Sequence, residues 1–274
     1  IRLSLVGSEM CIRDSFCLLR TEPEFDLYMT PINIDPEKPA LPVSHPYAYA
    51  VYLAKEMGPY ATLGLAEDTW GLNERVLSEE TFLEQCWDIH REREEMLFGA
   101  LEKTRQGAVV CVFDVTDRLQ HMFFRYLDDT HPANRDKDTE KHANAIRDLY
   151  ARMDELVGRI RAKLGEKDVL IVLSDHGFKL FRRGINLNTW LHQNGYLALK
   201  NGSGGSGEYF RGVDWEKSRA YALGLAGMFL NIEGREAKGI VRKGEEARRL
   251  KKEITEKLVG IKDPDTGETA IVNI

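Results

Sequence analysis

The sequence lacks several features that would assign a protein of this size to a class at once. No Cys-x-x-Cys pair occurs among its four cysteines, Cys11, Cys17, Cys86 and Cys111, which argues against a zinc knuckle or a dithiol redox motif. Their wide spacing favours a reducing compartment over a disulfide scaffold. No segment approaches about 18 consecutive apolar residues, so none is expected to span a membrane. The net charge is −6, so the chain does not have the excess of basic residues that is typical of nucleic-acid-binding proteins.

The first 15 residues lack any pattern that predicts native structure. Residues 5–15, LVGSEMCIRDS, show neither strand nor helix periodicity, and charged residues interrupt any signal-peptide core. The stretch also matches, position by position, the translation of a common sequencing-library transposon adapter. We therefore expect residues 1–15 to be an artefact and residues 16–274 to be native sequence from a truncated, metagenomic or draft-genome reading frame. Any signal peptide would have been lost with the native N-terminal segment. Localisation is therefore not predicted beyond the reducing compartment that the cysteine spacing favours.

The remaining composition, 43% hydrophobic and 30% charged, is ordinary for a globular protein. Apolar residues at helical spacing predict helices over residues 47–57, 78–104, 140–164 and 244–259. The alternating stretch FDLYMTPINI predicts one strand within residues 25–34. Two short strands joined near Gly224 to Gly227 are expected within residues 219–234.

Two continuous apolar runs, residues 108–113 and 169–173, lie on either side of the helix predicted for residues 140–164. Strands that are apolar on both faces, separated by a long helix, are typical of a parallel sheet covered by helices with a right-handed crossover. The expected fold class is therefore α/β, with a mostly parallel sheet sandwiched by helices and incomplete at both ends. A small α+β insertion or cap is expected at about residues 183–262.

Polar residues follow each of these two runs. Asp117 and His121 lie four apart in FDVTDRLQH, so a helical turn would place both on one face. Asp175 and His176 lie in LSDHGF, where Gly177 gives the turn its conformational freedom. Such groups gather at the carboxyl ends of strands in an open parallel sheet. Two Asp/His pairs at neighbouring strand ends would give two divalent cations a mixed nitrogen and oxygen shell, and such a centre can clamp a phosphoryl group.

These motifs resemble those of the alkaline phosphatase superfamily. SDHGF after an apolar strand, with TDRLQH one βα unit upstream, is most similar to the type I phosphodiesterase/nucleotide pyrophosphatase branch. FFRYLDDTHP, INLNTWLHQNGYL and KDPDTGE look like its prokaryotic members, and the resemblance covers roughly residues 21–274. It implies an alkaline phosphatase-like α/β sandwich with two divalent cations, zinc or alternatively manganese. Asp117 and His121 match the ligands of one cation, and Asp175 and His176 match two ligands of the other.

The chain departs from the family pattern in the residues that it lacks. The pattern includes an early Asp ligand, a Thr or Ser nucleophile that becomes phosphorylated and a further His ligand near the carboxyl end. Nothing before residue 21 matches the first two, and no histidine follows His192. The catalytic nucleophile is therefore unknown. We expect a fragment of a metal-dependent phosphoric-ester hydrolase that is itself inactive on phosphodiesters, with in-line phosphoryl transfer belonging to the whole enzyme.

The sequence alone leaves other functional interpretations open. A related phosphomutase or sulfatase would use the same metal residues, and a non-catalytic binding module would keep the fold without turnover. The expected partner is a small-molecule phosphate ester or nucleotide, without nucleic-acid binding. Arg118 and Arg125 are candidates either for contact with substrate phosphate or for the surface. His131 and His142 are expected to be solvated, and Thr116 is expected to cap a helix.

Overall fold

The computed structural model describes residues 2–6, 12–136, 138–224 and 227–274, with side chains from residue 16 onward. Met10 and Cys11, which belong to the stretch expected to be non-native, lie outside the described residues. The chain divides into two compact units, Ile1–Arg182 and Arg183–Ile274. Each unit has a hydrophobic core of its own. The insertion expected at residues 183–262 falls inside the second unit.

Antiparallel pairing builds the sheet of the first unit. Its strands are β1 (Arg2–Val6), β2 (Ile12–Arg20), β3 (Asp26–Met29) and β4 (Asn33–Ile34). β2 lies between β1 and β3 and also pairs with β4, in each case antiparallel. The single strand predicted within residues 25–34 is thus two short strands. Pro31 lies between them and has no N–H to donate to a ladder, so it interrupts the pairing.

The helices of the first unit are α1 (Ala48–Met57), α2 (Thr69–Asn73), α3 (Glu79–Lys103), α4 (Val115–Phe123) and α5 (Ala145–Arg161). The predictions over residues 47–57 and 78–104 are confirmed, and the Ser78 side chain caps α3 by accepting from the Thr81 N–H. α5 starts later than predicted because residues 140–142 form a separate 3-10 turn. Among the described helices, none combines the length and apolarity needed to cross a bilayer.

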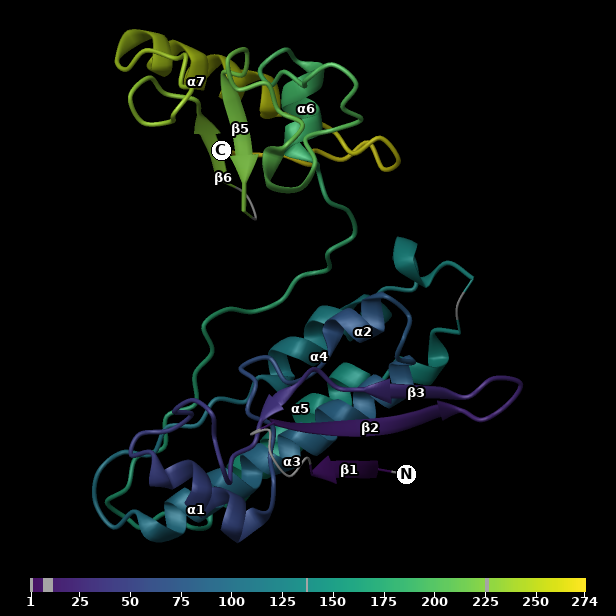
Figure 1. Cartoon of the computed structure of the whole chain (residues 1–274), viewed down its shortest axis with the longest axis vertical. Helices are drawn as coiled ribbons and strands as arrows, with labels where there is room; N and C mark the ends of the chain where they lie inside the picture. The colour runs from purple at the N-terminus through teal and green to yellow at the C-terminus, as the bar shows by residue number, and fades with distance from the viewer. Residues whose placement is uncertain (1, 7–11, 137, 225–226) are drawn as a thin grey trace. The chain divides into compact units, whose positions relative to one another are not determined.

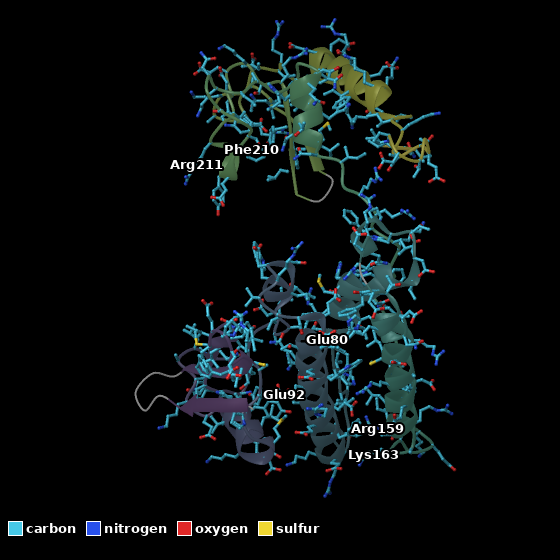
Figure 2. The ribbon with its side chains drawn as sticks, turned by 90° about the vertical axis from the view of Figure 1, so that its right-hand side faces the viewer. Glu80, Glu92, Arg159, Lys163, Phe210 and Arg211 are labelled. Atoms are coloured by element: carbon cyan, nitrogen blue, oxygen red, sulfur yellow. The ribbon has the colours of Figure 1, made fainter. Side chains whose placement is uncertain are left out.

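The core of the first unit lies where α4 packs against both α3 and α5 (Figure 1). Its buried side chains include Phe82 and Cys86 from α3, Leu119 and Phe123 from α4, and Leu149 from α5. A smaller cluster joins the C-terminal halves of α3 and α5 through Leu97, Leu156 and Ile160. Arg159 of α5 forms an ion pair with Glu94 of α3, and Lys163, which follows α5, lies 2.9 Å from Glu102. Figure 2 labels Arg159 and Lys163.

The two runs expected as parallel strands, residues 108–113 and 169–173, form no strand in the structure. Val109, Cys111, Phe113 and Leu170 pack against the small cluster between α3 and α5. The side chains that alternate with them, such as Val110 and Val169, are exposed. The described residues therefore form a mixed α and β fold with antiparallel sheets. Neither the parallel sheet nor its right-handed crossover is confirmed.

The second unit packs two helices and a hairpin around one core. Its elements are α6 (Leu187–Gln193), β5 (Ala220–Leu223), β6 (Gly227–Leu230) and α7 (Glu245–Leu258). The predicted strand pair is confirmed, with β5 antiparallel to β6 and Ala222 opposite Met228. Tyr196 and Val241 are fully buried in this core together with Ile254 of α7. Buried Asn231 joins three segments by donating to the carbonyls of Trp215, Ser218 and Lys238.

A polar network surrounds the first turn of α3. The hydroxyl of Tyr126 donates to Glu79 at 2.6 Å, and Lys141 Nζ lies 2.5 Å from Glu80 Oε1. His142, which the sequence predicted to be solvated, is buried and hydrogen-bonded to Glu80 at 3.1 Å, so that prediction is wrong. Acidic side chains in a first helical turn also interact favourably with the helix dipole. The network therefore ties residues 126–142 to the start of α3.

Lys141→Ala is expected to make the first unit less sensitive to acid. The hydrogen bond from Lys141 is the main reason that the pKa of Glu80 is lowered to about 2. A carboxyl whose folded pKa is lowered contributes stability above its unfolded pKa, and loses that contribution as pH falls from there toward the folded value. Without Lys141 the pKa of Glu80 should rise, and unfolding free energy should fall less between about pH 4.5 and 2. Side-chain NMR titration and denaturation at several pH values measure both. An unchanged pKa of Glu80 in Lys141→Ala would contradict this expectation. So would a Lys163→Ala variant whose unfolding free energy changes with pH in the same way as that of Lys141→Ala.

Candidate functional site

Helix α4 carries the first of the two predicted ligand pairs. The helix begins at Val115, and the four-residue spacing places Asp117 and His121 on one face, as expected. His121 Nε2 lies 3.3 Å from Asp117 Oδ1. Asp117 is 30% exposed, while the His121 side chain is about half exposed. Thr116 does not cap the helix, because its hydroxyl donates to the Phe113 carbonyl at 2.9 Å.

The second pair lies in a segment without regular structure, and it meets the first. His176 Nε2 is 3.7 Å from Asp117 Oδ1 and 3.6 Å from Asp175 Oδ2. The backbone N–H of His176 also donates to Asp175 Oδ1 at 3.1 Å, which holds the Asp175 side chain against the backbone of His176. Residues more than fifty positions apart thus converge on one oxygen of Asp117. The structure brings together all the side chains that the sequence predicted as ligands.

Phe178 packs against both imidazoles of this group. Its ring centroid lies 4.9 Å from that of His121 and 5.4 Å from that of His176, with interplanar angles of 80° and 60°. It also contacts Phe124, with 5.9 Å between ring centroids. Edge-on and tilted ring contacts of this kind favour particular orientations of a histidine ring. Sequence reasoning assigned Phe178 no role, and the only signal was its place two residues after His176.

A polar clamp holds the segment after Phe178 against residues 128–131. Arg182 Nη1 donates to Asp128 Oδ2 at 2.6 Å, and its Nη2 donates to the Thr130 carbonyl at 3.1 Å. His131 is buried, and its Nε2 lies 2.9 Å from the Phe181 carbonyl oxygen, so the prediction that this histidine is solvated is wrong. The clamp anchors the Asp175–His176 segment at its far end. It therefore helps to keep the second pair near α4.

The two arginines considered as phosphate contacts have different partners. Arg118 Nη1 lies 3.0 Å from Asp117 Oδ2, so its guanidinium faces the candidate site and is largely buried. Arg125 instead forms an ion pair with Glu79 and donates to Asn134 Oδ1 at 2.7 Å. These contacts place Arg125 in the network at the start of α3. Of the two, only Arg118 contacts a predicted ligand.

The donor set suits a divalent cation in its chemistry. Two carboxylates and two imidazoles are ligands that zinc accepts and that manganese also tolerates. Asp117 Oδ1 has an imidazole nitrogen at 3.3 Å and another at 3.7 Å, so the donors already face one another. Within the described ranges, however, no three histidine, cysteine or acidic side chains are grouped as a metal site. The arrangement is one of converging pairs that are open to solvent.

Comparison with known proteins assigns this region to a family. The family model for type I phosphodiesterase / nucleotide pyrophosphatase matches residues 41–273. Both Asp/His pairs lie within the matched range. No curated protein and no solved structure matches the chain.

Proposed function

The chain belongs to the type I phosphodiesterase/nucleotide pyrophosphatase family, a family of hydrolases, and we propose that its site serves metal-dependent hydrolysis of phosphoric esters or phosphoanhydrides. The observation that carries this proposal is the approach of His121 and His176 to Asp117 Oδ1, with Asp175 beside His176. A small phosphate ester or a nucleotide is the substrate class that suits such a solvent-open centre.

Each pair has a separate role in this proposal. Asp117 and His121 would hold one divalent cation, and Asp175 and His176 would supply two ligands of a second. When bound, such cations stabilise negative charge on the oxygens of a phosphoryl group. Arg118 holds the second oxygen of Asp117, while Phe178 restricts both imidazoles. The chain's own residues therefore contribute ligation and orientation, and no residue is assigned as nucleophile.

The proposal also includes the two apolar runs that precede these pairs. Residues 108–113 and 169–173 would be neighbouring strands of an alkaline phosphatase-like parallel sheet, with one ligand pair following each. Support comes from the family membership and from the exposed apolar side chains of these runs, among them Val112 and Leu173. Exposed apolar side chains in a continuous row are unfavourable in water and call for a covering layer.

Binding of orthophosphate provides a test that does not depend on turnover. The metal-free chain should bind Zn²⁺ or Mn²⁺ in calorimetric titration, and the metal-loaded chain should then bind orthophosphate. Orthophosphate should bind at least about tenfold more weakly without metal, because the cations neutralise its charge. His192→Ala serves as a control for histidine outside the site, since His192 Nδ1 is hydrogen-bonded to the Leu197 carbonyl in the second unit. A chain that binds no divalent cation, or that binds phosphate equally well without one, would refute the proposal.

A further inference from the structure

The second ligand pair lies on an exposed segment that contains no helix or strand. Residues 169–182 have no regular secondary structure, and the side chains of Asp175 and His176 are both exposed. A segment of this kind loses backbone freedom when it binds a cation. Contacts that hold the segment in its bound position beforehand reduce that cost and therefore raise its affinity.

One such contact is made by His131, which is buried. Its Nε2 lies 2.9 Å from the carbonyl oxygen of Phe181, which follows the second pair on the same segment. Its Nδ1 accepts a hydrogen bond from the backbone N–H of Ala133 at 3.2 Å. Both ring nitrogens of His131 therefore have a backbone partner, one on the segment and one on the turn that carries the histidine.

These two partners determine where the proton of the His131 ring lies. The Ala133 N–H can only donate, so Nδ1 has to be unprotonated. The Phe181 carbonyl oxygen can only accept, so Nε2 has to carry the proton. A neutral imidazole protonated on Nε2 satisfies both contacts, whereas the other tautomer satisfies neither. The hydrogen bonds thus assign a single form to the ring and a direction to its contact with the segment.

The turn that carries His131 is itself fixed to the end of the α4 region. It is the 3-10 turn Pro132–Asn134, which follows His131 directly. The buried Asn134 side chain donates to the carbonyls of Arg125 at 2.9 Å and Asp128 at 3.1 Å. Arg125 Nη1 donates in return to Asn134 Oδ1 at 2.7 Å. His131 therefore holds the segment from an anchored position.

We propose that the polar clamp sets the affinity of the Asp175–His176 pair for its cation, and that His131 is a positioning residue, which acts through the Phe181 carbonyl. This inference rests on the proposed function. The first pair, Asp117 and His121, lies on helix α4 and keeps its geometry without the clamp. The clamp therefore controls the second cation and not the first. Groups that orient a metal ligand from outside the ligand set typically change affinity by about 10–100-fold.

Two substitutions of His131 separate positioning from a merely structural role. His131→Asn keeps an acceptor near the place of Nδ1 but loses the donor to Phe181, whereas His131→Gln keeps a donor near the place of Nε2 but loses the acceptor for Ala133. Each removes one hydrogen bond of a buried residue, so both should lower the melting temperature by similar amounts. In calorimetric titration with Zn²⁺, His131→Asn should raise the dissociation constant of the second cation about tenfold. His131→Gln should leave it within about twofold of that of the unaltered chain.

Two further variants locate the effect. The double variant Asp175→Asn/His176→Ala removes the second pair, and the binding step that it loses identifies the second cation. In that background His131→Asn should cause no further loss of affinity, because its effect passes through the second pair. His142→Asn is the matched control. His142 is also buried and hydrogen-bonded in the first unit, at 3.1 Å from Glu80, so the variant should lose stability without losing affinity for either cation.

Several outcomes would overturn the inference. Unchanged affinity for the second cation in His131→Asn would do so, and so would equal losses in His131→Asn and His131→Gln. Should His131→Asn fail to fold, Arg182→Met removes the other half of the clamp at an exposed position, and normal affinity for the second cation in that variant would refute the proposal. An unaltered chain that binds no divalent cation would overturn the proposed function together with this inference, whereas normal binding of both cations in the clamp variants overturns this inference alone.

Discussion

Asp117→Asn is expected to weaken binding of a divalent cation at least about 100-fold, since even orienting groups outside the ligand set change affinity by about 10–100-fold. Asp117 Oδ1 is the atom on which His121 and His176 converge, at 3.3 Å and 3.7 Å. The substitution keeps the shape of the side chain but removes its charge, which is the property that a hard or borderline cation requires. The measurement is a calorimetric titration with Zn²⁺, with chelator competition if binding is tight.

Two comparisons make this expectation specific. Asp175→Asn should have a smaller effect than Asp117→Asn, because Asp175 is 87% exposed and is paired with His176, whereas Asp117 is 30% exposed and lies close to both histidines. Asp154→Asn, an exposed position on α5, should leave metal affinity unchanged. Equal losses at positions 117 and 154 would show that net charge, and not ligation, governs binding.

The helices were predictable because each is specified by local signals. In α3 the Ser78 cap, two acidic residues in the first turn and an apolar stripe agree, and the predicted bounds differ from the observed bounds by about one residue at each end. The same locality explains the first ligand pair. The spacing of Asp117 and His121 by itself implies a shared helical face, and their contact requires no knowledge of the rest of the fold.

The strands at residues 108–113 and 169–173 illustrate the limit of this reasoning. An apolar run indicates that its side chains favour burial, but it does not identify the strand with which its backbone pairs. In the structure Cys111 and Phe113 pack against α3 and α5, whereas Val110 and Val112 are exposed. A strand is defined by its ladder, which is a non-local property, so the pattern alone is insufficient.

Burial of polar residues was the least predictable feature. His131 and His142 lie among polar residues in the sequence, yet the rings of Phe123 and Tyr126 cover His142, and the Phe181 carbonyl meets His131. Such groups become visible only when partners distant in the sequence are brought together.

Phe123→Ala is expected to lower the unfolding free energy of the first unit by about 3–5 kcal/mol, the range for a large aromatic side chain removed from a core. Phe123 is 0% exposed. Its ring centroid lies 6.3 Å from that of Phe82 and 5.8 Å from that of Tyr126. Truncation would leave a cavity where α3, α4 and the following turn meet. Urea denaturation monitored by circular dichroism measures the change, and Phe25→Ala, at a position 67% exposed, should shift it by less than about 0.5 kcal/mol.

The same variant separates packing from ligation on one helix. Phe123 lies two residues after His121, and at about 100° per residue the two side chains point to nearly opposite faces of α4. Phe123→Ala should therefore keep the metal dissociation constant within about threefold at temperatures where the unit stays folded, because the core face changes and the ligand face does not. Asp117→Asn should show the reverse, with a large loss of metal affinity and a smaller loss of stability. If Phe123→Ala lost metal affinity in parallel with stability at a temperature of full folding, the two faces of α4 would be coupled, and the ligand pair would depend on core packing as much as on its spacing.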